Sequence, residues 1–458
     1  MNRTDTIAAI STAMNSSGIG IVRISGDDAF NIIKKIFRPM KDKDISAVKS
    51  HTIHYGNIVD NDEIVDEVLV LIMKAPHTYT RENTVEIDCH GGIYVLNKTL
   101  DLVLKNGARP AQPGEFTQRA FINGRIDLSQ AEAVIDLINA QNDYALKSAV
   151  GQLKGSVSEK IRQLRAEILE QIAYIEAALD DPEHYEMEGY GNELLPQLES
   201  CSAEIRKLID SADDGRIIKE GIKTVILGKP NAGKSSFLNA LTGQDRAIVT
   251  DIAGTTRDVL EESIRIKDIT LNIVDTAGIR ATEDVIEKIG VEKALEYAQD
   301  ADLIVYIADI SVPLDDSDRK ITELIKNKKS IVLLNKQDLK PAWDEGRLKE
   351  ILNCPFIETS VKNNTGISEF EETVRQMFYN REINFNDQVY ITNARQKNSL
   401  IKAENSLLSV IETINAGMSE DFFTIDMMDA YNALGEVIGE AAEDDLADEI
   451  FSKFCMGK

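Results

Sequence analysis

A glycine-rich loop that could hold phosphate lies near the middle of the chain. The β-branched run KTVIL at 223–227 leads into GKPNAGKS at 228–235, and a helix with apolar periodicity follows. This order is typical of a P-loop, because glycines let backbone N–H groups curl around an anion at a helix N-terminus. We expect Lys234 to neutralise phosphate oxygens and Ser235 to bind Mg²⁺. The alternative is that the GxxxxGKS match arises by chance and that the loop binds no nucleotide.

Two further motifs argue against that alternative. DTAG at 275–278 directly follows the apolar run 271–274. Asp275 would then reach Mg²⁺ through water, and the backbone of Gly278 would approach the γ-phosphate. GTTRD at 254–258 offers Thr256 as a second hydroxyl ligand of Mg²⁺, in the manner of a switch loop.

The base is indicated by NKQD at 335–338, which follows the buried run 330–334. A carboxylate at Asp338 can accept hydrogen bonds from the N1–H and exocyclic amine of guanine, whereas adenine lacks those donors. TSVK at 359–362 follows a last strand at 355–358 and would support the base through its backbone. We therefore predict GTP as substrate. The predicted contacts are Asn231, Ala232, Gly233, Lys234, Ser235, Ser236, Thr250, Asp251, Ile252, Ala253, Gly254, Thr255, Thr256, Asp275, Thr276, Ala277, Gly278, Asn335, Lys336, Asp338, Ser360, Val361 and Lys362.

The residues that would assist hydrolysis are less well defined. Ile279 follows DTAG and cannot orient a water molecule, so a polar residue downstream must act, and the candidates are Arg280, Glu283, Asp284 and Glu287. A solvated acidic helix face is the alternative for these side chains. The Asn231 carbonyl, with carbonyls of the 250–255 loop, could hold a monovalent cation in place of an arginine finger. Potassium dependence is therefore a hypothesis.

Composition limits the other functions. The chain has 458 residues, which predicts two to four domains, and its net charge of -26 argues against a surface built throughout for nucleic-acid phosphates. Four scattered cysteines without a CxxC pair predict neither a disulfide framework nor a zinc site. We find neither a signal peptide nor a run of about 18 to 20 apolar residues, so we expect a cytoplasmic protein that does not enter the membrane.

The remaining elements indicate a multidomain protein. Residues 1–118 alternate short strands and helices in an α+β pattern, with strands expected at 19–24, 67–73 and 84–89. Three- and four-residue apolar steps predict one long helix over 129–179, with a weak point at Gly151 and Gly155, and another helix over 193–211. Helical periodicity returns at 394–416 and 425–454. We therefore predict an all-α domain over 119–215 and 379–458, interrupted by an inserted α/β Ras-like P-loop domain over 216–378.

Several strings also resemble one family closely. PNAGKSS at 230–236, VTDIAGTTRD at 249–258, DTAGIR at 275–280 and CMGK at 455–458 look like the MnmE or TrmE family of tRNA uridine-34 modification GTPases. Similarity extends along essentially the whole chain, including GIGIVRISG at 18–26 and PGEFTQRAFINGRIDLSQAEAV at 113–134. The resemblance implies a potassium-stimulated homodimer, joined mainly through the N-terminal domain. With an FAD-binding partner (MnmG or GidA) in a heterotetramer, it would modify C5 of the tRNA wobble uridine.

The resemblance also implies roles for individual residues. Glu287, Lys234 and Cys455 would be catalytic, K⁺ would be held by Asn231, Thr250, Ile252 and Thr255, and Mg²⁺ by Ser235 and Thr256. The α+β domain is similar to folate-binding domains and would take 5-formyl- or 5,10-methylene-tetrahydrofolate through Arg23, Glu82, Arg125 and Lys458. The family often has Lys at the position of Arg125, a cation of different geometry. Without the resemblance, no spacing in the sequence relates these four charged residues, which would be interpreted as surface charge. The segment around Cys455 would then be expected to be disordered.

Two other readings use the same nucleotide site. A ribosome-assembly or RNA-chaperone GTPase usually carries a basic RNA-binding module, which the acidic balance and CMGK count against. A dynamin-like membrane mechanoenzyme would need a basic amphipathic or apolar tip, and the sequence offers none.

Overall fold

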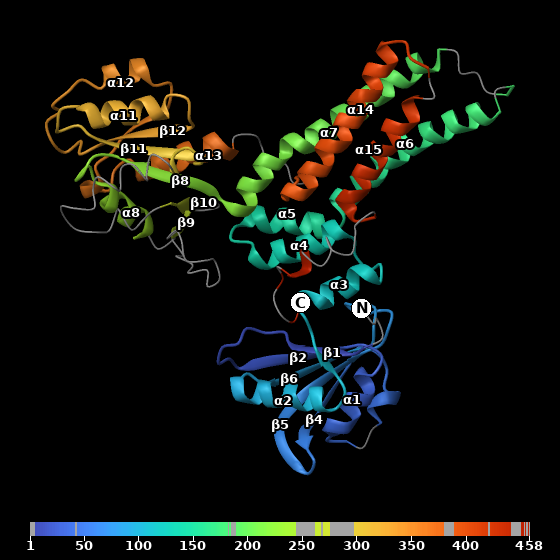
Figure 1. The fold of residues 1–458 in the computed structure, drawn as a ribbon. Coiled ribbons are helices and arrows are strands. Elements are labelled where there is room, and N and C mark those ends of the chain that lie inside the picture. The colour runs from blue at the N-terminus through green and yellow to red at the C-terminus, as the bar shows by residue number, and fades with distance from the viewer. Residues whose placement is uncertain are drawn as a thin grey trace. The chain divides into compact units, whose positions relative to one another are not determined.

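The computed structural model describes residues 5–41, 44–181, 183–184, 189–243, 262–266, 269–274, 297–379, 389–419, 422–440, 450–452, 454 and 457. Figure 1 shows the helices and strands of the chain, which divides into two compact units. One comprises Met1–Ile138, Gln152–Ser202 and Asn398–Lys458, and the other comprises Asn139–Gly151 and Ala203–Lys397. Among the described residues, no helix is long and apolar enough to cross a membrane.

A seven-stranded sheet forms the N-terminal part of the first unit. Its strands are β1 (Ile7–Ile10), β2 (Ile19–Ser25), β3 (Phe37–Pro39), β4 (Thr52–Asp60), β5 (Glu63–Met73), β6 (Thr84–His90) and β7 (Arg109–Pro110), in the order β3-β4-β5-β6-β2-β1-β7. Neighbouring strands are antiparallel except for the parallel pair β1 and β7. The helices α1 (Ala29–Ile36) and α2 (Ile93–Lys105) bury apolar side chains with the sheet, and a 3₁₀ turn η1 (Ile45–Ala47) joins this core. The α+β prediction is confirmed.

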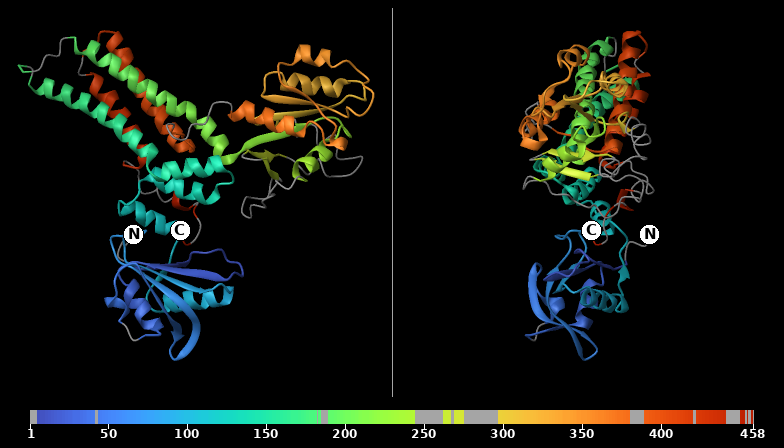
Figure 2. Two further views of the ribbon diagram at one scale, coloured as in Figure 1. Left: turned by 180° about the vertical axis from the view of Figure 1, so that it is seen from behind. Right: turned by 90° about the vertical axis from the view of Figure 1, so that its left-hand side faces the viewer.

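Helices form the rest of the first unit. They are α3 (Glu115–Ile122), α4 (Leu128–Asn139), α6 (Ser156–Asp180), the start of α7 (Tyr190–Glu220), α14 (Ala394–Asn415, from residue 398) and α15 (Phe423–Ile438). One apolar stripe of α6, including Ile161, Ile168 and Ile175, is buried, as three- and four-residue steps require. α15 packs along α6 (Figure 2). Segments before and after the insertion therefore share one helical layer.

The prediction of one helix over 129–179 is wrong, although the predicted weak point at Gly155 is confirmed. The chain forms α4, α5 (Asp143–Leu153) and α6 instead. Asn142 separates α4 from α5. Its side-chain oxygen accepts a hydrogen bond from Ala145 N at 2.8 Å, which caps the N-terminus of α5. Gly155 separates α5 from α6 because its φ of 97° is left-handed, whereas Gly151 lies within α5. α7 also extends well beyond the predicted 193–211.

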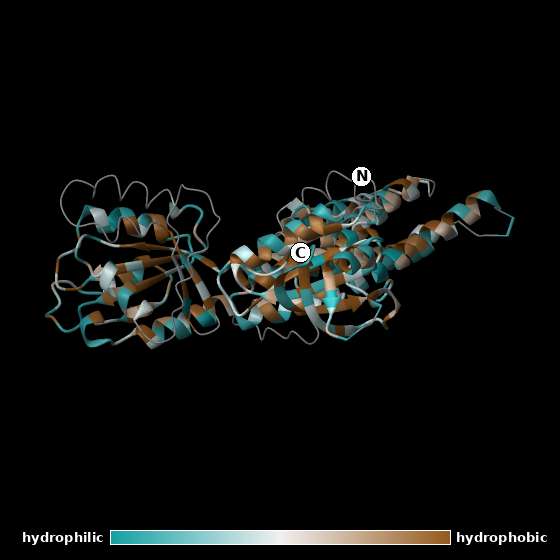
Figure 3. Cartoon of the chain, turned by 90° about the horizontal axis from the view of Figure 1, so that it is seen from below, coloured by the Kyte–Doolittle hydropathy of each residue, from teal (hydrophilic) through white to brown (hydrophobic). Residues whose placement is uncertain are grey.

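A six-stranded sheet organises the second unit. Its strands are β8 (Ile222–Leu227), β9 (Glu262–Ile266), β10 (Ile269–Ile273), β11 (Leu303–Asp309), β12 (Ser330–Asn335) and β13 (Phe356–Glu358), in the order β13-β12-β11-β8-β10-β9. Only β9 runs antiparallel to its neighbour among these described strands. β11 and β12 are buried along their whole length, and the strands of this sheet are coloured as largely hydrophobic in Figure 3. Continuous burial is expected where helices cover both faces of a parallel sheet.

Helices cover the two faces of this sheet. α8 (Lys234–Thr242) and α13 (Ile367–Tyr379) contribute Phe237 and Phe370 to the core on one face. α11 (Asp316–Ile325) and α12 (Gly346–Ile351) contribute Ile321 and Leu348 on the other. The loops after β8, β11, β12 and β13, the last of which includes the 3₁₀ turn η2 (Val361–Asn363), therefore meet at the carboxyl edge of the sheet, where open α/β folds bind ligands.

Candidate functional site

The loop after β8 follows a path that only glycine permits at two positions. Gly228 has a φ of 154° and Gly233 a φ of 106°. A Cβ at Gly228 would lie 2.5 Å from the Ile307 carbonyl oxygen, and a Cβ at Gly233 would lie 2.3 Å from Nδ2 of Asn335. Asn231 also adopts a left-handed φ, of 59°. The loop thus has the tight curvature that a phosphate cradle needs.

Lys234 begins α8 and reaches back over this loop. Its Nζ donates to the carbonyl oxygens of Gly228 at 2.7 Å and Lys229 at 2.9 Å. One ammonium and the N-terminus of α8 therefore face the same loop, which gives it a positive potential suited to an anion. Ser235 lies in the first turn of α8, next to Lys234, where its hydroxyl fits the predicted role of a Mg²⁺ ligand.

Asn335 connects the phosphate loop with the predicted base-binding segments. Its side chain is buried, and its Nδ2 donates to the Ala232 carbonyl oxygen at 2.8 Å. Its Oδ1 accepts longer hydrogen bonds from Val361 N at 3.3 Å and Thr359 Oγ1 at 3.4 Å. A single amide therefore joins the loops that follow β8, β12 and β13.

Asp338 is exposed but held in a fixed orientation. Ser360 Oγ donates to its Oδ1 at 2.7 Å, and this hydrogen bond, together with the charges of Lys362 and Lys336, holds the pKa of Asp338 below its usual value. The carboxylate is thus ionised at neutral pH and accepts hydrogen bonds only. Lys336, with a left-handed φ of 67°, is anchored by Asp309 at 2.6 Å. Ser360 was expected to act through its backbone, and the structure adds its hydroxyl.

An ion pair between the half-buried Lys229 of the phosphate loop and the buried Asp318 of α11 is absent from the sequence predictions. Lys229 Nζ lies 2.7 Å from Asp318 Oδ2, and the hydroxyl of the buried Tyr306 donates to Asp318 Oδ1 at 2.7 Å. Burial alone would lower the pKa of Lys229, but the hydrogen bond and charge of Asp318 raise it on balance. Asp315 caps α11, with Asp318 completing a capping box. That D-x-x-D spacing was the available signal, although it does not reveal Lys229 as the partner.

Other residues predicted to contact the nucleotide, its cations or the attacking water lie outside the described residues. They are Thr250, Asp251, Ile252, Ala253, Gly254, Thr255, Thr256, Asp275, Thr276, Ala277, Gly278 and Glu287. Within the described part of the chain, no group of three or more His, Cys, Asp or Glu side chains is arranged to hold a metal ion. The predicted Mg²⁺ site does not need one, because hydroxyls and phosphates would supply its protein and substrate ligands.

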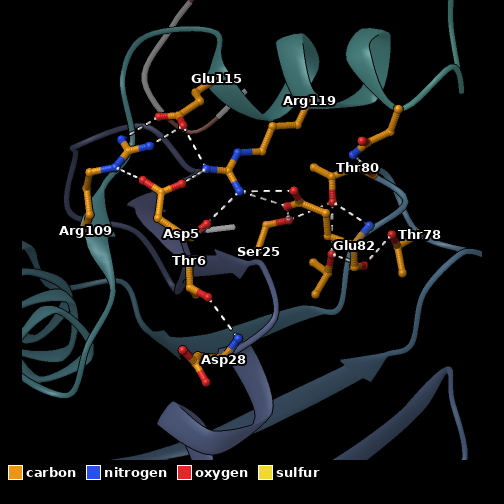
Figure 4. A network of polar contacts seen from close by, with 12 residues as sticks. Asp5, Thr6, Ser25, Asp28, Thr78, Thr80, Glu82, Arg109, Glu115 and Arg119 are labelled. Atoms are coloured by element: carbon orange, nitrogen blue, oxygen red, sulfur yellow. Dashed lines mark hydrogen bonds and ion pairs between the residues drawn. The ribbon is translucent and has the colours of Figure 1, made fainter. Parts of the chain in front are cut away.

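In the first unit, Arg119 is the centre of a polar network (Figure 4). This buried side chain donates from Nη1 to both carboxylate oxygens of Glu82 at 3.1 Å, and from Nη2 to Asp5 at 2.8 Å and Glu115 at 3.0 Å. Arg109 binds the two oxygens of Glu115 at 2.6 and 2.9 Å. Ion pairs of this kind fix the orientation of each member. Glu82, predicted from resemblance alone, is therefore rigidly placed.

Arg23 and Arg125 lie on either side of Glu82 in sequence but share one aromatic neighbour. Their guanidinium carbons lie 5.7 and 4.6 Å from the centroid of the Tyr79 ring. Arg125 Nη1 also donates to the Tyr79 carbonyl oxygen at 3.2 Å, and Thr78 Oγ1 donates to the Glu82 carbonyl oxygen at 2.7 Å. The three predicted residues thus converge on the segment 78–82.

The C-terminal segment reaches the same region. The Gly457 carbonyl oxygen accepts hydrogen bonds from Ser11 Oγ at 3.1 Å and Arg23 Nη1 at 3.3 Å. Cys455 and Lys458, the predicted site residues of this segment, lie outside the described residues. The hydrogen bond of Gly457 therefore connects Arg23, a predicted folate contact, with the CMGK motif, although the two are far apart in the sequence.

Comparisons with known proteins cover the whole chain. The sequence matches the family descriptions "GTP-binding protein TrmE N-terminus" over residues 6–125 and "MnmE helical domain" over residues 128–455. It is 54% identical over 457 residues to the tRNA modification GTPase MnmE of Lachnoclostridium phytofermentans, covering 100% of both chains. The chain belongs to the MnmE family. The MnmE protein of Bacillus subtilis is 45% identical over 458 residues, covering 99% of this chain and 100% of the relative.

Among solved structures, the G domain of the T. maritima FeoB iron transporter is 28% identical and covers 34% of this chain and 97% of its own, with a TM-score of 0.25. That TM-score is too low to bear on function. The MnmE family relation, by contrast, accounts for the three kinds of domain: an α+β N-terminal domain, a helical domain and a P-loop domain.

Sequence reasoning missed several residues of the N-terminal site in this MnmE family member. Glu115 and Arg119 both lie in the family-like string PGEFTQRAF at i and i+4, and this spacing was the available signal. Asp5 and Arg109 gave none. A pocket of about 510 Å³ adjoins Arg125. Its lining residues are His51, Met73, Pro76, His77, Thr78, Tyr79, Arg81 and Arg125.

Proposed function

We propose that this GTPase of tRNA modification binds GTP between the 228–235 loop and Asp338 and uses its hydrolysis to drive modification of C5 of the tRNA wobble uridine. The observation that carries the proposal is the buried Asn335 amide, which connects the phosphate loop to the segment that orients Asp338. Phosphate grip and purine selection are thereby coupled. The test is a titration of purified protein with GDP and ADP in Mg²⁺ buffer. Equal affinity for the two nucleotides would refute the proposal.

The proposed potassium site uses Asn231, with carbonyls of Thr250, Ile252 and Thr255. Asn231 lies within the phosphate loop, and asparagine is among the few residues besides glycine that readily adopt its left-handed φ of 59°. Hydrolysis in KCl should be faster than in NaCl at equal ionic strength. Glycine tolerates a φ of 59°, so Asn231→Gly removes the side-chain oxygen without adding strain. It should abolish the difference between the salts, while Asn363→Ala in η2 should preserve it.

Glu287 is the proposed residue that orients the attacking water. Ile279 leaves that role vacant in DTAGI, and the family resemblance selects Glu287 among the polar candidates. Glu287→Gln should slow single-turnover hydrolysis by on the order of 10²-fold or more without weakening nucleotide binding. Glu283→Gln is the matched control. An equal effect of both substitutions would remove Glu287 from this role.

The proposed folate site binds 5-formyl- or 5,10-methylene-tetrahydrofolate through Arg23, Glu82, Arg125 and Lys458. Convergence of the first three on the segment 78–82 supports it. Arg23→Gln should weaken folate binding, measured by calorimetry, without changing GTP hydrolysis. Cys455→Ser tests a role of that thiol: tRNA modification should fall while GTPase activity persists. Retention of both activities would exclude the thiol from the chemistry.

A homodimer through the N-terminal domain is the proposed assembly. The sheet face opposite α1 and α2 exposes Ile53, Tyr55 and Leu69, which are 62%, 49% and 42% exposed, and Tyr55 lies opposite Leu69 in register. An exposed cross-strand apolar patch favours burial against a second copy. Tyr55→Lys should therefore yield monomers in analytical ultracentrifugation. Tyr94→Lys, at a 79% exposed tyrosine of α2, should leave the dimer intact.

The proposed complex also contains an FAD-binding MnmG-type partner, in a heterotetramer that takes tRNA. The acidic net charge of -26 suggests that the partner supplies much of the positive surface for RNA. Cells lacking this protein should accumulate tRNA with an unmodified wobble uridine, measured by mass analysis of nucleosides. An unchanged nucleoside profile would refute the modification role and leave nucleotide binding standing.

A further inference from the structure

The pocket beside Arg125 is cationic in an otherwise acidic chain. Two arginines, Arg81 and Arg125, and two histidines, His51 and His77, line it. None of the described residues that line it carries a carboxylate, although acidic residues outnumber basic ones 77 to 51 in the sequence. Its volume of about 510 Å³ falls within the range of roughly 300–1,000 Å³ that is common for small-ligand sites. The pocket therefore suits an elongated anion.

Two of these residues have an unusual backbone conformation. His51 and Arg81 have left-handed φ values of 59° and 60°, which non-glycine residues rarely adopt. Arg81 is further fixed because its Nη1 donates to the Asn123 carbonyl oxygen at 2.8 Å. Ser50 Oγ lies within hydrogen-bonding distance, 2.8 Å, of His51 Nδ1. Arg81 therefore projects beside the segment that carries Arg125.

Building on the proposed folate site, we infer that this pocket binds the γ-linked glutamate chain of a polyglutamylated tetrahydrofolate. Arg125 is one of the proposed folate contacts, and its guanidinium can meet the first glutamate carboxylate of the folate. Each further γ-linked glutamate adds one carboxylate, and guanidinium groups such as Arg81 bind carboxylates in a two-pronged geometry. Met73, Pro76 and Tyr79 supply an apolar wall for the intervening methylene groups. The pocket thus selects for the length of the folate tail.

The experiment compares the mono- and triglutamate forms of 5-formyl-tetrahydrofolate by calorimetry on the full-length protein. Partly exposed charge pairs add little each, so we expect the triglutamate to bind on the order of tenfold more tightly at low salt, with the ratio falling as salt is added. Arg81→Gln should bring the triglutamate affinity close to that of the monoglutamate, whose own affinity should change less than about twofold. Arg38→Gln, at an exposed arginine of β3 outside the pocket, should leave the ratio unchanged.

The outcomes separate the tail inference from the folate proposal. Equal affinity of the two forms for the unaltered protein would overturn the tail inference and leave the folate site standing. Equal weakening of both forms by Arg81→Gln would also overturn it, since that result indicates a general structural role. If Arg81→Gln abolished tRNA binding but left the ratio of triglutamate to monoglutamate affinity unchanged, the pocket would be assigned to RNA phosphates instead. Binding of neither form would refute the folate site itself.

Discussion

Replacing Asn335 by Ala tests whether one buried amide couples the phosphate loop to the base-binding segments. The substitution removes the 2.8 Å donor of the Ala232 carbonyl oxygen, and Ala232 is only 1% exposed. Leaving a buried acceptor unpaired costs about 1–3 kcal/mol, which corresponds to roughly 5- to 150-fold in an equilibrium constant. The bonds at 3.3 and 3.4 Å add less because they are long.

We expect this cost to be shared between nucleotide affinity and domain stability, because the bond exists without nucleotide. Fluorescent GDP should bind on the order of tenfold more weakly, mainly through faster dissociation. Urea unfolding should shift to lower urea, followed by the fluorescence of Trp343, the single tryptophan, whose indole donates to the Asp309 carbonyl oxygen. Asn363→Ala, an exposed residue of η2, is the matched control. A dissociation constant within twofold of the unaltered value, with an unchanged unfolding midpoint, would refute the reasoning.

Three further predictions concern charged groups. Asp338→Asn should lower GTP affinity by about 100-fold or more and improve binding of xanthosine triphosphate, because the amide can donate to the 2-carbonyl of xanthine. A competition titration of the two nucleotides measures this change, and a retained preference for GTP would contradict it. Lys229→Met leaves the buried Asp318 without its cation and should cost about 3 kcal/mol in urea unfolding, whereas Lys326→Met at an exposed site should not. Burial alone would raise the pKa of Glu115, but its ion pairs with arginine lower it below 4.5. Its stabilisation is therefore complete above pH 4.5 and lost as pH falls through the lowered pKa, so hydrogen exchange in α3, corrected for intrinsic rates, should accelerate in acid; pH-independent protection would contradict this.

The elements that local patterns determine could be predicted from the sequence. In the second unit, β8, β11 and β12 are largely buried on both faces. Apolar runs mark these strands, and nucleotide motifs follow β8 and β12, so the strands and the position of the motifs at their ends could both be predicted. The glycine at 155 predicted the break after α5, but the break before α5 could not be predicted from periodicity, because apolar spacing continues through it. Asn142 acts there as a cap, and the same residue type is common within polar helix faces.

Long-range polar partners were the other missing part. Arg119 binds Glu82, which lies 37 positions away, and Arg109 binds Asp5, which lies 104 positions away. No local spacing encodes such pairs, since the sheet order brings β1 next to β7. The cation for Asp318 was missed for the same reason. Lys229 stands at a position where the GxxxxGKS motif allows any residue type. Its pairing with Asp318 depends on how α11 packs against the sheet.

The contact between Gly457 and Ser11 has a consequence for how the protein is made. These residues are 446 positions apart, so the hydrogen bond can form only after the whole segment between them has been synthesised. Gly457 has a φ of 87°, and a Cβ there would lie 2.3 Å from the Ile10 carbonyl oxygen, so another residue type could not dock in the same way. The strand β1, which ends at Ile10, is therefore synthesised long before Gly457 can dock beside it. Reporter fusions that displace this glycine would leave Arg23 without one of its anchors.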